Sequence, residues 1–133
     1  MALVQTMISN IQRLHAQRAP ASDAELQHAV TQGSWSALPG ALRQLLKLSN
    51  GFLTPGGVHL YGTGDLAERN QTFEISEYSQ GYLLIGDDSG GKGYLMRLGD
   101  EDSAIFSSGL GDLDVAGFRQ EAATLQEWID ALN

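Results

Sequence analysis

Apolar residues that recur three and four positions apart predict helices at the start of the chain. The first such stretch predicts an amphipathic helix over residues 2–18, which ends before Pro20 and whose apolar face is formed by Leu3, Val4, Met7, Ile8, Ile11 and Leu14. Ser22 then stands three residues before Glu25, the spacing of a capping box. A second helix is therefore predicted from Ser22 to Gly33.

A third helix is predicted where Leu38-Pro39 meets another run of apolar positions. Proline suits the first helical residue, because its missing N–H would have no partner there. Asn50-Gly51 ends the helix, since glycine readily adopts the left-handed conformation that follows many helices. The buried face is expected to consist of Leu42, Leu45, Leu46 and Ser49.

Beyond the turn Pro55-Gly56-Gly57 the apolar residues come in short runs, which are typical of strands. We expect strands over residues 58–61, 73–78, 82–85, 94–98 and 104–106, and a β-hairpin that turns through the glycine-rich residues 86–93. After the first of these strands, Asp65 is expected to cap a short helical turn, with Glu68 as its capping-box partner.

The end of the chain returns to helical spacing. Apolar residues fall four, three, four and three positions apart at Phe118, Ala122, Leu125, Ile129 and Leu132. This pattern allows a helix that starts at either end of the series. Thr124 with Glu127 makes a further capping box and favours a start near Thr124, with residues 115–118 extended.

Helices first, then closely spaced strands, then one helix is the order of an α+β domain. The strands follow one another too closely for helical crossovers, so the sheet is predicted to be mainly antiparallel. A length of 133 residues is that of one ordinary domain, and we expect residues 1–133 to form it.

Composition removes several classes of function. The chain has no cysteine, which excludes disulfides, thiol catalysis and thiolate metal sites. No apolar run approaches the ~20 residues that cross a bilayer. Residues 1–19 lack the basic segment and the unbroken apolar stretch of a signal peptide. We therefore expect a cytoplasmic protein with no membrane partner.

The net charge of −8 is unevenly distributed. Residues 1–50 carry four basic and two acidic side chains, whereas residues 51–133 carry four basic and fourteen acidic ones. The acidic second segment would repel phosphates, so direct nucleic-acid binding is disfavoured. The asymmetry suits a basic protein partner, although acidity that serves only solubility is the alternative interpretation.

The segment from Gly86 to Gly93 nearly matches a phosphate-binding P-loop. The eighth residue is glycine where the motif needs a hydroxyl for magnesium, and residues 94–98 predict a strand instead of a helix. Two aspartates within the loop would also repel a triphosphate. A glycine-rich hairpin turn explains the segment better.

No other motif predicts a cofactor, a metal or a catalytic residue. Residues 62–67 fit the dinucleotide pattern G-x-G-x-x-[GA], but no parallel βαβ unit surrounds them. His15, His28 and His59 share no metal-binding spacing, and no EF-hand loop occurs. Because a Ser-His-Asp triad meets only in space, a small hydrolase stays open as an alternative, one that would need a deep pocket with converging groups.

Acidic residues gather in three predicted turns. These turns hold Asp87-Asp88, Asp100-Glu101-Asp102, and Asp112 with Asp114. Solvated loops are the simpler interpretation, and the sharper one is a negative face for a basic partner. Trp35 lies in a polar stretch, where it either anchors the core or packs at a sheet edge or an interface. The predicted partner-binding residues are Asp87, Asp88, Asp100, Glu101, Asp102 and Trp35.

In this order the pieces resemble the SUKH superfamily, which includes the fungal Smi/Knr cell-wall-assembly regulators and many bacterial relatives. The resemblance covers about residues 22–132 and leaves an extra helix over residues 2–18. It is carried by the helix from Leu38-Pro39 to Asn50-Gly51, residues 58–61, Asp65-Leu66-x-x-x-Asn70, residues 82–88, the following Gly-Tyr strand and a C-terminal helix with Trp128.

The resemblance implies helices packed on one face of a twisted antiparallel sheet of about five or six strands. It also implies a non-enzymatic role, since bacterial members are mostly immunity proteins that bind and neutralise a cognate toxin domain. Our first hypothesis is a cytoplasmic immunity protein that blocks a basic toxin by occlusion. The alternative is a regulatory or scaffold domain of the Smi/Knr type without a toxin partner.

Overall fold

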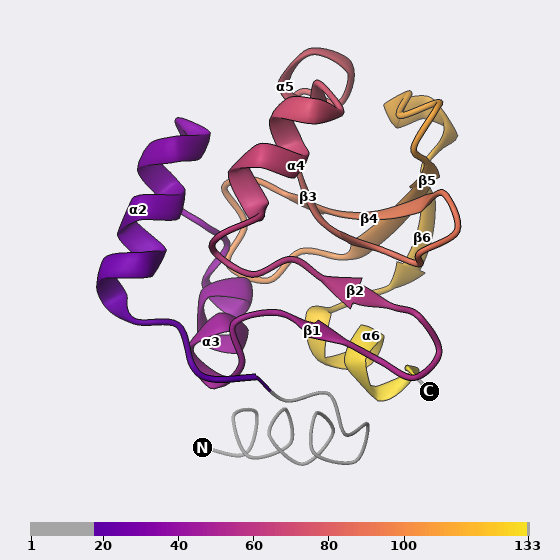
Figure 1. Ribbon diagram of the computed structural model, residues 1–133. Helices are drawn as coiled ribbons and strands as arrows, with labels where there is room; N and C mark the ends of the chain where they lie inside the picture. The colour runs from indigo at the N-terminus through magenta and orange to yellow at the C-terminus, as the bar shows by residue number, and fades with distance from the viewer. Residues whose placement is uncertain (1–17, 133) are drawn as a thin grey trace.

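The computed structural model describes residues 18–132, which form a strongly twisted sheet surrounded by helices (Figure 1). The helices are α2 (Asp23–Gly33), α3 (Gly40–Leu48), α4 (Leu66–Thr72), α5 (Ile75–Tyr78) and α6 (Leu125–Asp130), with a 3₁₀ turn η1 (Val115–Gly117). The strands are β1 (Phe52–Leu53), β2 (His59–Leu60), β3 (Tyr82–Asp87), β4 (Lys92–Arg97), β5 (Ile105–Gly109) and β6 (Arg119–Ala122). The helix expected over residues 2–18 falls almost entirely outside the described residues.

The six strands join in chain order, and every neighbouring pair is antiparallel. This arrangement confirms the α+β class, the antiparallel sheet and the expected number of strands. It also confirms the β3–β4 hairpin, in which Tyr82 lies opposite Arg97 and Asp87 opposite Gly93. The strands extend further into the glycine-rich segment than predicted, so that only residues 88–91 form the turn.

The core lies between the sheet and the pair α3 and α6, which lie together below the sheet in Figure 1. The Trp128 ring of α6 packs on Phe52 of β1, with ring centroids 6.3 Å apart, and on Tyr94 of β4, with centroids 5.1 Å apart. Helices α4 and α5 lie beside β3. The predicted inner face of the third helix is confirmed, because all four of its members are fully buried: Leu42, Leu45, Leu46 and Ser49.

Helix starts follow the local sequence closely. The capping box of α2 is present, with Glu25 N–H donating to Ser22 Oγ at 3.1 Å and Ser22 N–H donating to Glu25 Oε1 at 2.9 Å. Helix α3 begins one residue later than predicted, so Pro39 is its N-cap residue. Gly51 has a φ of 85°, the left-handed conformation expected of it.

Two predictions for the middle of the chain are wrong. Residues 73–78 do not form a strand, because Glu74 adopts a left-handed φ of 53° and starts the single-turn helix α5. Asp65 precedes α4 as predicted, but its side chain makes no capping hydrogen bond. The carboxylate of Glu68 pairs with the neighbouring Arg69 instead of closing a capping box.

At the end of the chain, the predicted start of α6 is correct, and the prediction for the residues before it is wrong. Thr124 accepts a hydrogen bond from Glu127 N–H at 3.1 Å, so α6 starts where the capping pattern favoured. Residues 115–117 form the turn η1 where extended chain was expected. Strand β6 was not predicted, because its side chains are exposed at the sheet edge and show no apolar alternation.

Candidate functional site

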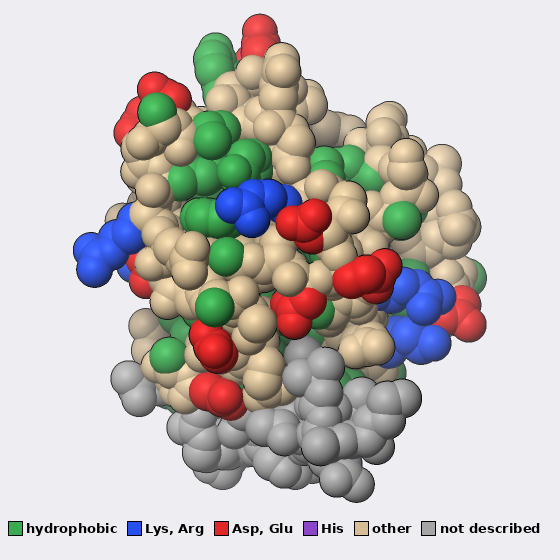
Figure 2. Space-filling view, turned by 180° about the vertical axis from the view of Figure 1, so that it is seen from behind, with side chains coloured by type: hydrophobic (Ala, Val, Ile, Leu, Met, Phe, Trp, Pro, Cys, Tyr) green, Lys and Arg blue, Asp and Glu red, His purple; other side chains and the backbone are tan. Residues whose placement is uncertain are grey.

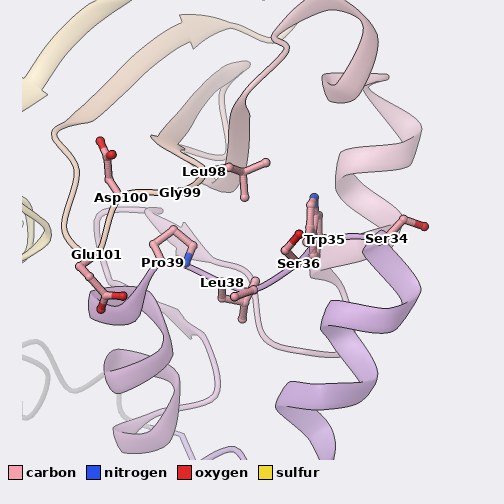
Figure 3. Close-up of a pocket in the computed structure, with 10 residues that line it drawn as sticks. Ser34, Trp35, Ser36, Leu38, Pro39, Leu98, Gly99, Asp100 and Glu101 are labelled. Carbon is pink, nitrogen blue, oxygen red and sulfur yellow. The ribbon is translucent and has the colours of Figure 1, made fainter.

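A surface groove beside Trp35 is one of several hollows in the described part of the chain, and Figure 3 shows part of it. It consists of two hollows of about 450 and 470 Å³ that share Ser34, Trp35 and Leu98. We call it the Trp35 groove. The first hollow is lined mainly by residues 34–39 and 98–101, and the second by Trp35 with residues of α4, α5 and the start of β3.

The end of α2 fixes the position of Trp35. Ser34 caps the helix in the left-handed conformation, with a φ of 58°, which few residues other than glycine adopt readily. The Trp35 N–H donates to Val30 O at 3.1 Å. The indole ring covers Gly33 so closely that a Cβ there would lie 2.2 Å from a ring carbon. The half-buried ring is therefore held before any partner arrives.

The turn after β4 forms the opposite wall of the first hollow. Leu98 N–H donates to Gly81 O at 2.8 Å, and Gly99 turns the chain with a φ of 93°. Asp100 follows at the rim, where its carboxylate lies 4.0 Å from the guanidinium of Arg97. Both side chains are about half exposed, at 48% for Arg97 and 51% for Asp100, so this ion pair is weak.

Glu101 lines the groove and also faces the start of α3. Its backbone carbonyl accepts a hydrogen bond from Ala41 N–H at 2.8 Å. Its carboxylate lies against Gly40, where a Cβ would come within 1.9 Å of Oε2. A negative charge beside a helix N-terminus is favourable, because the first N–H groups of the helix have no partner inside it.

Asp102 belongs to α6 instead of the groove. Its Oδ1 accepts a hydrogen bond from Leu125 N–H at 3.2 Å, in the first turn of that helix. The acidic turn that holds Asp100, Glu101 and Asp102 thus contacts two helix N-termini and one groove. Sequence reasoning treated these acids as one loop face and missed the separate structural contacts of Glu101 and Asp102.

Asp87 and Asp88 lie at the other end of the β3–β4 hairpin, about 20 Å away for six-residue strands. Asp87 accepts a hydrogen bond from the Tyr61 hydroxyl at 2.7 Å, and burial together with this bond raises the pKa of Tyr61. Asp88 Oδ1 accepts from Gly90 and Lys92 N–H at 2.8 and 3.0 Å. Desolvation opposes the charge of Asp88, but these backbone donors outweigh it and lower its pKa.

The structure therefore brings together three of the six predicted residues, Trp35, Asp100 and Glu101. It places Asp87, Asp88 and Asp102 in turns and at a helix start. Sequence reasoning did not identify Leu98 as a neighbour of Trp35, since the two lie about sixty residues apart along the chain. The sequence around Trp35 does not indicate which distant residues lie beside it.

An aromatic surface continues from the groove across β3, β5 and β6. Tyr82 lines the second hollow, and its ring also packs edge-on against Phe118 and Phe106, with centroids 5.0 and 5.8 Å apart. The guanidinium of Arg97 lies 4.8 Å from the centre of the Phe106 ring. Figure 2, seen from behind, shows hydrophobic side chains gathered on the upper part of that face with charged side chains beside them.

The groove offers apolar, polar and acidic side chains to a partner. Within residues 18–132, no three His, Asp or Glu side chains are placed to hold a metal ion. The charged side chains that line the groove in the described structure are those of Asp100 and Glu101. In the same residues, no helix has the length and the apolar composition that crossing a membrane requires.

Fold and groove together define a compact α+β domain that presents a preformed apolar surface with two carboxylates beside it. The chain belongs to the SMI1 / KNR4 family (SUKH-1), whose model matches residues 20–131. Membership confirms the resemblance seen in the sequence and indicates a protein-binding domain. A comparison with curated proteins gives no match.

Proposed function

We propose that this protein is a cytoplasmic immunity protein that neutralises a cognate bacterial toxin domain by occlusion. It binds the toxin tightly, covers the toxin's active site and performs no chemistry itself. Family membership supports the protein-binding part of this proposal. The excess of acidic side chains after residue 50 supports a basic partner, such as a nuclease whose own surface must attract phosphates.

The observation that carries the proposal is the rigidly held Trp35 in an otherwise accessible groove. Tryptophan contributes strongly at protein interfaces when it sits in a preformed, well-packed setting. A side chain that is already ordered loses little conformational entropy on binding. A stable complex buries roughly 1,200–2,000 Å² in total, so the toxin would extend past the groove onto surrounding surface.

Co-expression tests the proposal directly. Each neighbouring gene is expressed in turn from an inducible promoter, in cells with and without the full chain, to find one with a toxic product. The proposal predicts that growth is rescued and that the two proteins co-purify in a defined ratio. Rescue without a complex, or a complex with no rescue, contradicts neutralisation by occlusion. A stable complex only with a non-toxic neighbour favours the scaffold alternative.

Charge contributes mainly to the rate of encounter. Asp100 is the informative residue here, because Glu101 and Asp102 also contact helix N-termini. Replacing Asp100 by lysine is expected to slow association with the toxin several-fold at low salt, while dissociation changes less. Stopped-flow kinetics at several salt concentrations measures this. An unchanged association rate removes Asp100 from the encounter surface.

A further inference from the structure

We propose that a carboxylate side chain of the partner docks on the Arg97 guanidinium, while an apolar neighbour of that residue packs on the aromatic rings around it. We call this surface the Arg97 platform, and it consists of Arg97 with Tyr82, Phe106 and Phe118. Docking of this kind deepens the proposed function and rests on it in one respect, that the partner is a protein.

The Arg97 platform lies on the face of the sheet opposite to α6. Arg97 stands directly across from Tyr82 in the β3–β4 pairing, so both side chains project from one face. Tyr94 lies three residues before Arg97 in β4 and packs on α6, so it projects from the other face. The Tyr82 ring contacts the rings of Phe106 and Phe118, with centroids 5.8 and 5.0 Å apart. Three aromatic rings thus surround the base of the Arg97 side chain.

The guanidinium of Arg97 is held in place but has unused donors. It lies 4.8 Å from the centre of the Phe106 ring, a distance at which the ring attracts a cation. The hydrogen bond from Arg97 to Ser103 is donated by the backbone N–H, and the guanidinium makes none to a described residue. The ion pair with Asp100 spans 4.0 Å, and the Arg97 side chain is 48% exposed. A guanidinium carries five N–H donors, so a carboxylate of the partner can accept two of them at once.

Arg97 is less occupied than the other cations that lie over rings. Three basic side chains of residues 18–132 have this position, those of Arg69, Lys92 and Arg97. Arg69 is paired with the carboxylate of Glu68, and Lys92 lies 3.5 Å from that of Glu121. A new carboxylate would have to replace an existing one at Arg69 or Lys92, whereas at Arg97 it adds hydrogen bonds that the free protein lacks.

Asp100 limits how much negative charge the platform accepts. Its carboxylate is 51% exposed and repels an incoming anion, but an exposed pair at 4.0 Å contributes little. A carboxylate in bidentate contact with the guanidinium gains more than this repulsion costs. A nucleic acid would bring several phosphates close to Asp100 and to an acidic chain, so it is disfavoured. The preferred occupant is therefore one carboxylate on an otherwise uncharged or basic segment.

The rings beside Arg97 favour an apolar or aromatic neighbour of that carboxylate. Tyr82 and Phe118 are half-buried, so part of each ring faces solvent. Tyr82 also lines the second hollow of the Trp35 groove, and Asp100 lines the first. A partner that covers the groove therefore reaches Arg97 as well. Arginine and aromatic side chains are the residues that contribute most often to binding energy at protein interfaces.

Selection from a phage-displayed library of random nonapeptides on the immobilised full chain tests the proposal. We expect the selected peptides to share an aspartate or glutamate next to an aromatic or other apolar residue. One selected peptide is then synthesised with its acid or with the matching amide and titrated against the protein. The amide is expected to weaken binding at least about tenfold, because it loses the charge-assisted hydrogen bonds. Selected peptides without an acidic residue, or no enrichment at all, overturn the proposal.

Variants locate the contact. Arg97→Ala is expected to weaken the acidic peptide at least about tenfold, and Arg97→Lys about threefold or more, since lysine keeps the charge and loses the planar fork. Asp100→Asn is expected to tighten binding about twofold or more, because the carboxylate that repels the peptide is gone. The matched control is Arg43→Ala, which removes a guanidinium of similar exposure, 50%, from α3 and should leave affinity within about twofold. Equal affinity of wild type and Arg97→Ala, or weaker binding by Asp100→Asn, overturns the proposal.

Two further titrations test direct pairing and the class of partner. A peptide whose acid is replaced by lysine should bind Arg97→Glu more tightly than wild type, as two groups in contact require. Absence of this reversal contradicts the pairing. A single-stranded oligonucleotide of thymidines is titrated in parallel, and no binding is expected. Oligonucleotide binding that is lost in Arg97→Ala assigns the platform to nucleic acid and overturns the proposal.

The toxin complex separates this proposal from the proposed function. If the toxin is neutralised and Arg97→Ala binds it as tightly as wild type, the platform proposal fails and the immunity function stands. If no toxin binds but acidic peptides are selected and depend on Arg97, the immunity function fails and the platform proposal stands. Urea unfolding of each variant confirms that it remains folded during these measurements.

Discussion

Replacing Asn70 by alanine is expected to destabilise the protein far more than its place on a short helix indicates. The Asn70 side chain bonds to both backbone groups of Leu84 in β3. Its Nδ2 donates to Leu84 O at 2.9 Å, and its Oδ1 accepts from Leu84 N–H at 2.9 Å. Beyond β2, Tyr61 N–H still donates to Ile85 O at 2.9 Å, and Asn70 bonds to the next residue of β3 after that contact.

The magnitude follows from those two groups. Both lie in a fully buried residue, and each buried backbone group left without a partner costs about 1–3 kcal/mol. Water that enters the space left by the amide would recover part of this. We therefore expect Asn70→Ala to lower the free energy of unfolding by about 3 kcal/mol, a large share of the 5–15 kcal/mol typical of a domain.

Urea unfolding, followed by circular dichroism and tryptophan fluorescence, measures this change. With a slope of about 1–3 kcal/mol per molar urea, the midpoint should fall by about 1–3 M. Gln71→Ala is the control, because its amide makes one exposed hydrogen bond of 3.1 Å and should change stability by less than about 0.5 kcal/mol. A loss below about 1 kcal/mol for Asn70→Ala would refute the reasoning that this amide completes the sheet.

Three further predictions concern a helix end and two acidic turns. Ser34→Gly relieves the left-handed φ of 58° and should raise the unfolding free energy by about 0.5–1 kcal/mol, as measured by urea titration, and a decrease would contradict that strain. Asp102→Ala removes the acceptor of Leu125 N–H and should cost about 1 kcal/mol, with amide exchange faster in α6 than elsewhere. The pKa of Asp88 is lowered in the folded state, so its contribution to stability is present above about pH 4 and is lost as the pH falls through that lowered pKa. Asp88→Asn should therefore flatten the acid limb of a stability profile between about pH 5 and 2, and an unchanged limb would contradict this.

Sequence patterns predicted those elements whose signals are local. The hydrogen bonds that the side chains of Ser22 and Thr124 accept mark the starts of α2 and α6, because each joins residues three positions apart. The β3–β4 hairpin was also predictable, since two apolar runs flank one glycine-rich turn. In these cases the residues that bond to each other lie close together in the sequence.

Elements that depend on distant contacts were not predictable. Residues 73–78 contain alternating apolar positions, yet Ile75 is buried within α5 beside β3. Strand β6 carries Arg119, Gln120 and Glu121, whose exposed side chains reflect its place at the sheet edge. Their secondary structure depends on packing partners that lie far away in the sequence.

The candidate site was partly predictable for the same reason. Trp35 stands out as a large aromatic residue in a polar stretch, and Asp100 as one of several turn acids. That these two lie across a groove from each other depends on how α2 and the end of β4 pack. In the sequence, Asp87 and Asp88 looked as available to a partner as Asp100. In the structure, their carboxylates accept hydrogen bonds from backbone N–H groups of the hairpin turn and from the Tyr61 hydroxyl.

Hydrogen–deuterium exchange of the full chain, with and without the cognate toxin domain, tests the central claim most directly. A recognition surface at the Trp35 groove predicts slower amide exchange on binding in residues 33–39 and 98–101, with little change in the hairpin turn at residues 88–91. Protection confined to that turn or to β6, with residues 33–39 unaffected, would contradict the account.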